Sequence, residues 1–211
     1  MAVSGSRQKA DLKVVILGSS SVGKTSLIQR YLSGHFVENR PSTIGAAFSV
    51  KQWGNFKVAI WDTAGEERFR ALSSFYSRDA CAAILAYSIT DKKSFEELQK
   101  HFLCLLDHAR ENCLLVVVGT KSDLIDEDGR QVEFEVGQEF AKQENLRRND
   151  YFSTNEAKAS TAFFETSSKT GENVNELFQF LEKTLLSRLK GSERDGVISL
   201  DRKTKSSGGC C

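Results

Sequence analysis

The sequence predicts an α/β domain in which helices cover both faces of a mostly parallel sheet. Short apolar, β-branched runs alternate along the chain with longer segments whose apolar residues recur at helical spacing. The 211 residues, 40% of them hydrophobic, are enough for one such domain with a substantial core and too few for two large ones. We therefore expect a single domain.

Six segments are expected to form strands. They are Leu12–Leu17, Ala46–Gln52, Phe56–Asp62, Ala82–Tyr87, Leu114–Gly119 and the short Phe163–Glu165. The second and third are expected to pair, with a turn at Gly54 and Asn55 between them.

Three segments carry helix signals. Lys24–Leu32 suits a helix, and Ser94 followed by Glu97 forms a capping box that opens another, ending near Ala109. Asn173 followed by Glu176 opens the last helix. Its apolar residues lie at helical spacing, which predicts one face packed on the sheet; they are Val174, Leu177, Phe178, Leu181, Leu185 and Leu189.

The polar segments set the expected boundaries. Residues 1–10 form a polar N-terminus expected to be disordered, and residues 11–190 form the domain. Residues 144–161 are polar and are expected to be a loop insertion. Residues 191–211 are rich in Gly, Ser and charge and are expected to form a flexible tail.

Composition narrows the compartment and the partners. No apolar run approaches the ~20 residues that a membrane-spanning helix needs, and the N-terminus lacks the apolar core of a signal peptide, so we expect the cell interior. Ala2 excludes N-myristoylation. A formal net charge of +1 gives no reason to expect nucleic-acid binding. Cys81, Cys104 and Cys113 lie in apolar stretches and are expected to be buried free thiols.

Residues Gly18–Thr25 (GSSSVGKT) fit the phosphate-binding pattern G-x-x-x-x-G-K-[ST], placed after a buried strand and before a helix. The glycines let the backbone wrap a phosphate, to which the loop amides and the helix N-terminus donate. Lys24 supplies charge to the β- and γ-phosphates, and the Thr25 hydroxyl suits Mg²⁺. The alternative, a glycine turn beside a surface lysine, does not explain the strand–loop–helix context. The motif predicts a nucleoside triphosphate without identifying the base.

Two further motifs extend this pattern into a family resemblance. With Ser42–Gly45 (STIG) and Trp61–Gly65 (WDTAG), the chain resembles the small GTPases, and among them the Rab family, over essentially its whole length. The resemblance implies the P-loop small GTPase fold, a six-stranded sheet with one antiparallel strand and five flanking helices. It also implies that Thr43 ligates Mg²⁺ in the triphosphate state and that Asp62 contacts Mg²⁺ through water.

The base and the γ-phosphate are assigned in the same way. By resemblance, the Gly65 amide senses the γ-phosphate and Phe36 lies against the base. In Thr120–Asp123 (TKSD), Asp123 can accept from the ring N–H and the exocyclic amine of guanine, a pair that adenine lacks. Thr120 replaces the family's Asn, which we expect to weaken the tie to the phosphate loop. Glu165–Lys169 (ETSSK) resembles the last signature, whose amides reach the guanine carbonyl, with Ser168 in place of Ala.

These assignments give the expected site. The nucleotide-binding residues are Ser20, Ser21, Val22, Gly23, Lys24, Thr25, Ser26, Phe36, Thr43, Gly65, Thr120, Lys121, Asp123, Ser167, Ser168 and Lys169. The metal-binding residues are Thr25, Thr43 and Asp62, and the catalytic residues are Lys24, Thr43, Gly65 and Glu66.

Glu66 is the most informative departure from the family, which has Gln there to orient the attacking water. An ionised glutamate can only accept hydrogen bonds. It also brings repulsion of up to about 4 kcal/mol for two unit charges ~4 Å apart. Ser20, in place of a small glycine, crowds the same region. We therefore expect slow intrinsic hydrolysis. Alternatively, Glu66 is a solvated loop residue and another group positions the water.

Sequence motifs similar to those of Rab proteins also occur in Ile44–Phe48, Glu67–Leu72 and Phe75–Arg78. The stretch between Phe48 and Trp61 is short, and in this it is most like the Rab twenty subgroup. In this family, Phe48, Trp61 and Tyr76 form an exposed aromatic patch that effectors read in the triphosphate state. Whether Trp53 belongs to the patch or to the core stays open.

The last two residues, Cys210 and Cys211, resemble the double geranylgeranylation signal of Rab proteins. Two lipid chains give stable membrane anchoring, whereas one gives only marginal binding. The resemblance implies partners of four kinds: an exchange factor, a GTPase-activating protein, effectors, and a prenylation escort with a GDP-dissociation inhibitor. We expect a monomer in the cytoplasm and on the cytoplasmic face of endosomal, phagosomal or Golgi membranes.

The predicted function is a GTP/GDP switch that regulates vesicle traffic and membrane fusion. One alternative is a GTP-loaded membrane adaptor that scarcely hydrolyses. Another, a P-loop kinase or ATPase, needs an adenine pocket, and Asp123 and Lys169 argue against it.

Overall fold

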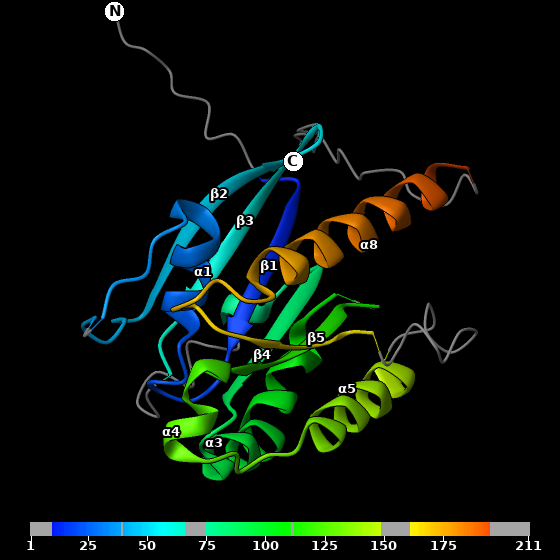
Figure 1. Ribbon diagram of the computed structural model, residues 1–211. Helices are drawn as coiled ribbons and strands as arrows, with labels where there is room; N and C mark the ends of the chain where they lie inside the picture. Colours follow the sequence, from blue (N-terminus) through cyan, green and yellow to red (C-terminus); the bar gives the residue numbers. More distant parts are fainter. Residues whose placement is uncertain (1–9, 39, 66–74, 111, 149–160, 195–211) are drawn as a thin grey trace, which may run out of the picture.

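A computed structural model describes residues 10–38, 40–65, 75–110, 112–148 and 161–194 (Figure 1). In this part of the chain six strands form one sheet in the order β2-β3-β1-β4-β5-β6. The strands are β1 Leu12–Leu17, β2 Ala46–Trp53, β3 Phe56–Thr63, β4 Ala82–Ser88, β5 Leu114–Thr120 and β6 Phe163–Thr166. β2 pairs antiparallel with β3, while the other neighbours pair parallel. The α/β prediction is therefore confirmed, and each predicted strand lies within one or two residues of its observed bounds.

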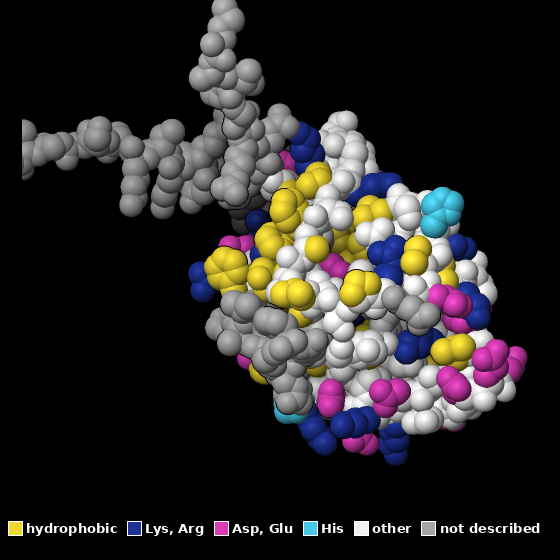
Figure 2. Space-filling model, turned by 90° about the vertical axis from the view of Figure 1, so that its left-hand side faces the viewer, with side chains coloured by type: hydrophobic (Ala, Val, Ile, Leu, Met, Phe, Trp, Pro, Cys, Tyr) yellow, Lys and Arg dark blue, Asp and Glu magenta, His cyan; other side chains and the backbone are white. Residues whose placement is uncertain are grey.

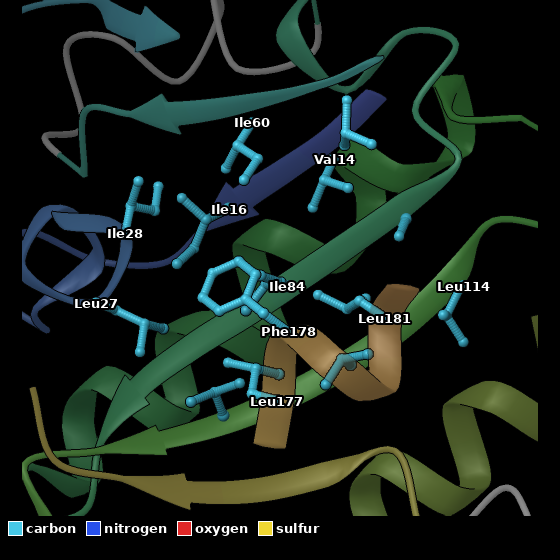
Figure 3. Packing of buried hydrophobic residues seen from close by; sticks show 14 of the residues in the cluster. Val14, Ile16, Leu27, Ile28, Ile60, Ile84, Leu114, Leu177, Phe178 and Leu181 are labelled. Atoms are coloured by element: carbon cyan, nitrogen blue, oxygen red, sulfur yellow. The ribbon is translucent and has the colours of Figure 1, made fainter. Parts of the chain in front are cut away.

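Helices cover both faces of the sheet (Figure 1). They are α1 Lys24–Ser33, α3 Lys92–Glu97, α4 Ile125–Asp128, α5 Phe134–Arg148 and α8 Val174–Arg194. Since successive side chains of a strand point to opposite faces, β1 supplies both cores. Val14 and Ile16 pack with residues of α1 and α8 (Figure 3), whereas Val15 and Leu17 pack with residues of α3 and α5.

The last helix buries the apolar face that its sequence predicted. Phe178 is fully buried between the sheet and α1, where its ring stacks on Tyr31 at 3.8 Å between centroids. Burying each such large apolar side chain contributes about 1.5–3 kcal/mol. This packing holds α1, and with it the loop that precedes α1, against the sheet.

The helix predicted from Ser94 to Ala109 was wrong in two respects. α3 begins at Lys92, and its N-cap is Asp91, whose side chain accepts from the Lys93 and Ser94 amides at 3.0 and 3.3 Å. Asp and Ser are both good caps, and the point where the chain leaves β4 selects Asp91. The helix also ends at Glu97 and gives way to a π-helix, Leu98–Phe102, and a 3₁₀-helix, Leu103–His108.

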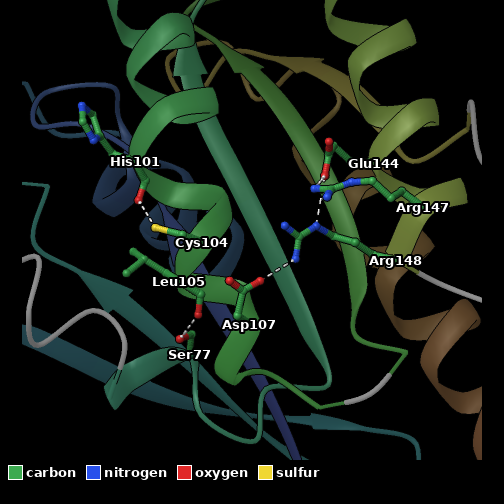
Figure 4. A network of polar contacts seen from close by, with 8 residues as sticks. All are labelled: Ser77, His101, Cys104, Leu105, Asp107, Glu144, Arg147 and Arg148. Atoms are coloured by element: carbon green, nitrogen blue, oxygen red, sulfur yellow. Dashed lines mark hydrogen bonds and ion pairs between the residues drawn. The ribbon is translucent and has the colours of Figure 1, made fainter.

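The C-terminal end of α5 is attached to this irregular segment (Figure 4). Arg148 contacts Asp107 at 3.2 Å and Glu144 at 3.0 Å, and Arg147 contacts Glu144 at 2.7 Å. α5 thus continues to Arg148, so the first five residues of the segment assigned to an insertion are helical. α8 likewise continues to Arg194, four residues into the segment assigned to the tail.

The cysteines differ in exposure. Cys81 is buried as predicted, whereas Cys113 is half-buried. Burial of its thiol raises the pKa of Cys113 to about 12, so that this thiol stays protonated. Cys104 is exposed, contrary to the prediction, because the 3₁₀-helix turns its side chain outward, where it donates to the His101 carbonyl (Figure 4). Within the described ranges, no helix combines the length and apolarity needed to span a membrane.

Candidate nucleotide-binding site

A cavity of about 460 Å³ opens where parallel strands of the sheet end. Ligands of open α/β sheets bind at this carboxyl edge. Fourteen of the sixteen predicted nucleotide-binding residues line it: Ser20, Ser21, Gly23, Lys24, Thr25, Ser26, Phe36, Thr43, Gly65, Thr120, Lys121, Asp123, Ser168 and Lys169. The other two, Val22 and Ser167, are buried behind the wall. The structure therefore brings together segments that lie up to 149 residues apart.

The phosphate loop is folded tightly between β1 and α1. Gly18 has a φ of +148°, and a Cβ there would lie 2.1 Å from the Ala86 carbonyl oxygen, so only glycine fits. The Lys24 ammonium donates to the carbonyls of Gly18 and Ser19 at 2.8 and 2.7 Å, which fixes it over its own loop. Burial lowers the pKa of Lys24 to about 8, and the nearby Asp62 carboxylate partly opposes this shift. An anionic ligand in the cavity would favour the charged ammonium.

Three oxygen-bearing side chains converge at one corner of the cavity. The Thr25 hydroxyl donates to Asp62 Oδ2 at 2.7 Å and lies 2.9 Å from the Thr43 hydroxyl, which is 3.4 Å from the same carboxylate oxygen. The other oxygen, Asp62 Oδ1, is buried and has no hydrogen-bond partner among the described residues.

Burial makes the charged form of the Asp62 carboxylate costly at this corner. Burial raises the pKa of Asp62, and the Thr25 hydrogen bond, the Lys24 charge and the Thr43 hydrogen bond only partly offset that rise. A buried carboxylate oxygen without a partner is costly. Beside two hydroxyl oxygens it makes a donor set that fits a hard cation such as Mg²⁺. The three residues predicted as metal ligands are thus the residues that could hold one.

Gly65 is packed directly against the phosphate loop. A Cβ at this position would lie 2.4 Å from the carbonyl carbon and oxygen of Ser19 and from the amide nitrogen of Ser20. The absence of a side chain therefore lets the backbone of residue 65 reach the wall of the cavity. Glu66, the next predicted catalytic residue, lies outside the described residues.

The end of the cavity opposite the metal corner is built from the loops after β5 and β6. Asp123 lines it, and the Ser167 hydroxyl donates to Asp123 Oδ1 at 2.5 Å. Ser167 itself accepts from the Thr170 amide at 3.0 Å. A hydrogen bond to the carboxylate restricts its rotation, so Ser167 positions Asp123.

Thr120 connects the loop after β5 to the phosphate loop, a connection that the replacement of Asn by Thr was expected to weaken. Its hydroxyl lies 2.5 Å from the Val22 carbonyl in the phosphate loop and 2.8 Å from the Tyr87 carbonyl of β4. A hydroxyl carries one proton, whereas the amide of the family's Asn carries two. Thr120 therefore keeps the tie between the two loops but serves its two acceptors with one proton.

Sequence reasoning missed further residues of the wall. The segment between Phe36 and Thr43 contributes Val37, Glu38, Arg40, Pro41 and Ser42, and Thr63 and Leu124 also line the cavity. The position of this segment between two assigned residues was the available signal.

Two supporting contacts had no local signal at all. The Ser19 hydroxyl donates to Glu97 at 2.6 Å, which joins the phosphate loop to the end of α3. Arg130 holds Glu165, the first residue of the last signature, through two hydrogen bonds of 2.5 and 2.8 Å. Each contact is a long-range pairing of side chains, which sequence spacing does not reveal.

An aromatic cluster lies on β2, β3 and the segment before β4. Phe48 faces Trp61 across the β2–β3 pair with 5.3 Å between ring centroids, and Trp61 lies 5.4 Å from Tyr76. Phe48 is 62% exposed, and hydrophobic side chains gather on the face of the molecule that contains β2 (Figure 2). Trp53 is instead buried and donates to the Tyr31 hydroxyl at 2.9 Å, so it belongs to the core.

The fold and the cavity define a phosphate-loop protein of the small GTPase class. A model of the Ras family matches residues 13–187, and the chain belongs to that family. It is 38% identical over 202 residues to Ras-related protein Rab-20 of Homo sapiens, covering 82% of this chain and 84% of the relative. It is 35% identical to Ras-related protein Rab-20 of Mus musculus, covering 97% and 99%. It is 37% identical to GTP-binding protein ypt5 of Schizosaccharomyces pombe, covering 94% and 92%. The Rab resemblance is confirmed, and the chain is a GTPase.

Proposed function

We propose that this chain is a Mg²⁺-dependent GTP/GDP switch that regulates vesicle traffic and hydrolyses GTP slowly. The observation that carries the proposal is the convergence of Thr25, Thr43 and Asp62 on one corner of the cavity. Thr25 and Asp62 belong to α1 and β3, whereas Thr43 lies in the connection between α1 and β2. A ligand-dependent contact of Thr43 at this corner would change the position of that connection.

The residues of the site have separate tasks in this proposal. Thr25, Thr43 and Asp62 hold Mg²⁺, which when bound neutralises charge on the phosphates. Lys24 and the Gly65 amide donate to the β- and γ-phosphates, and Asp123 reads guanine. By resemblance, Glu66 takes the sequence position of the Gln that orients water, and its ionised carboxylate cannot donate a hydrogen bond. Phe36 covers the base, and the backbone around Ser168 and Lys169 contacts it.

The first test is the replacement of Thr43 by Ala, with Thr184→Ala on α8 as the control. Loss of one metal ligand should weaken the Mg²⁺-dependent binding of a GTP analogue about tenfold, equivalent to about 1.4 kcal/mol, and should leave GDP binding nearly unchanged. Dissociation constants measured with Mg²⁺ and with a chelator would report this. Equal loss for both nucleotides would contradict a switch role for Thr43.

Effectors are proposed to recognise the nucleotide state at the aromatic cluster. Phe48, Trp61 and Tyr76 form one continuous cluster on the pair of strands that follows Thr43. A change in the Thr43 segment reaches this cluster directly through β2. Effectors that distinguish the two nucleotide states are therefore expected to contact it.

Membrane attachment completes the proposal. Cys210 and Cys211 lie outside the described residues, and their lipidation is proposed from the resemblance to the Rab tail signal. An escort protein, a GDP-dissociation inhibitor, an exchange factor and an activating protein would act on the chain as on other Rab proteins. The expected location is the cytoplasm and the cytoplasmic face of endosomal, phagosomal or Golgi membranes.

Glu66 favours a second candidate, a membrane adaptor that stays loaded with GTP. Single-turnover hydrolysis of preloaded protein, with and without an activating protein, separates the two. An activated rate that remains near zero would support the adaptor.

A further inference from the structure

Arg40 is a cation that faces the cavity and has no partner among the described residues. It lines the cavity, its side chain is exposed, and no described residue forms a hydrogen bond or ion pair with it. The other lining cations have different positions. Lys24 is committed to two carbonyls of its own loop, and Lys121 and Lys169 come from the loops that build the opposite end.

The chain places Arg40 near the metal corner. Two residues, Pro41 and Ser42, separate it from Thr43, so the Cα atoms of Arg40 and Thr43 are at most about 11 Å apart. The Thr43 hydroxyl lies 2.9 Å from that of Thr25. Pro41, the single proline of the chain, follows directly and restricts residue 40 to extended backbone conformations. This restriction lowers the backbone entropy that is lost when the segment is fixed on a ligand.

Glu66 cannot supply the hydrogen-bond donor that the family's Gln supplies to the reaction. Glu66 follows Gly65, and an ionised carboxylate cannot stabilise the charge that develops on the γ-phosphate. A guanidinium carries five donors in a planar fork that matches phosphate oxygens, and it remains charged throughout the working pH range. In related nucleotide hydrolases, an arginine from the same chain stabilises the transition state in this way.

We propose that Arg40 is a catalytic residue of GTP hydrolysis, contacting the γ-phosphate and supplying the donors that Glu66 cannot. The inference rests on the proposed hydrolysis at this site. The oxygen of water bonds to the γ-phosphorus while the bond from that phosphorus to the bridging oxygen breaks. The electron pair of the broken bond stays on GDP, and both water protons end on the released dihydrogen phosphate. The Arg40 guanidinium donates to the oxygens on which negative charge accumulates.

The test compares Arg40→Ala and Arg40→Lys with Arg110→Ala as the matched control. Arg110 is exposed, outside the cavity wall, and its backbone donates to Ala80, just before β4, at the opposite edge of the sheet. Single-turnover phosphate release from protein preloaded with GTP and Mg²⁺ should fall about tenfold or more in Arg40→Ala. Arg40→Lys should recover part of the rate, and Arg110→Ala should match the wild type.

A second measurement separates catalysis from binding. Aluminium fluoride takes the place of the transferred phosphoryl group beside GDP, and it should slow the dissociation of fluorescent GDP from the wild type but not from Arg40→Ala. The affinities of the variant for GDP and for GTP should each stay within about threefold of the wild type.

The outcomes are distinct. A variant that hydrolyses GTP at the wild-type rate, or that loses affinity as much as rate, overturns the role of Arg40 and leaves the GTPase intact. A wild type that releases no phosphate and ignores aluminium fluoride overturns both this inference and the hydrolysis proposed for the site.

Discussion

Replacement of Gly65 by Ala is the sharpest available test of how residue 65 and the phosphate loop fit together. The new Cβ would lie 2.4 Å from three backbone atoms of Ser19 and Ser20, about 1 Å closer than the 3.4 Å of ordinary contact. Those atoms cannot rotate away, unlike the end of a flexible side chain. One of the two backbone segments must therefore move.

The structure indicates which segment moves. The phosphate loop is held by the two Lys24 hydrogen bonds, by the Ser19–Glu97 hydrogen bond and by the Thr120 contact with Val22. Residue 65 should therefore shift outward and withdraw its amide from the cavity. Loss of one hydrogen bond to a charged phosphate costs about 1.5–3 kcal/mol. We expect GTP to bind about ten- to a hundredfold more weakly, with GDP nearly unaffected.

The assay measures the dissociation constants of GDP and of a slowly hydrolysed GTP analogue, together with thermal stability. Gly34→Ala is the control. It also replaces a glycine, at a φ of +73°, but the added Cβ meets nothing within 4 Å. That control should lose about 1 kcal/mol of stability without changing nucleotide preference. If Gly65→Ala weakens GDP and GTP equally, the phosphate loop has moved instead, and the reasoning is wrong.

Four further predictions concern the nucleotide, the chemistry, the tail and pH. Asp123→Asn should cost several kcal/mol of GTP affinity and favour xanthine nucleotides, because one acceptor becomes a donor; binding as tight as the wild type would exclude Asp123 as the base reader. Glu66→Gln should raise single-turnover hydrolysis about tenfold, equivalent to ~1.4 kcal/mol, and an unchanged rate would mean that another group limits it. Replacing Cys210 and Cys211 by Ser should move the protein to the soluble fraction with nucleotide binding intact, and wild-type retention on membranes would rule out anchoring there. The pKa of Lys24 is about 8 in the folded protein, below its ordinary value of 10.5. Between these two pH values the unfolded chain binds more protons than the folded chain, so the stability of the nucleotide-free protein should rise as the pH rises from about 8 to 10.5. Calorimetry should also show proton uptake on GDP binding above about pH 8, and Lys24→Arg should abolish that uptake.

The sequence by itself determined the elements and the chemistry of this protein. Local periodicity marks the strands, because a β-branched apolar run such as Leu12–Leu17 suits burial on both faces of a sheet. The motif Gly18–Thr25 carries its own meaning, since the glycines, Lys24 and Thr25 act on one ligand within eight consecutive residues. From these features the fold class, the phosphate site and the family could all be predicted.

Only the tertiary structure decided which side chains support the site. The N-cap of α3 is Asp91 and not the predicted Ser94. Both residue types are good caps, and the turn after β4 determines which of them caps the helix. Thr120 retains the contact with Val22 because β5 ends beside the phosphate loop, at a sequence separation of 98 residues. Trp53 is buried because the packed chain places it beside Tyr31 of α1, whose hydroxyl accepts from its ring nitrogen. Arg40 lines the cavity because the chain between Phe36 and Thr43 runs along the cavity wall. Local propensities act over a few residues, whereas these outcomes depend on contacts between distant segments, and only the packed chain fixes those contacts.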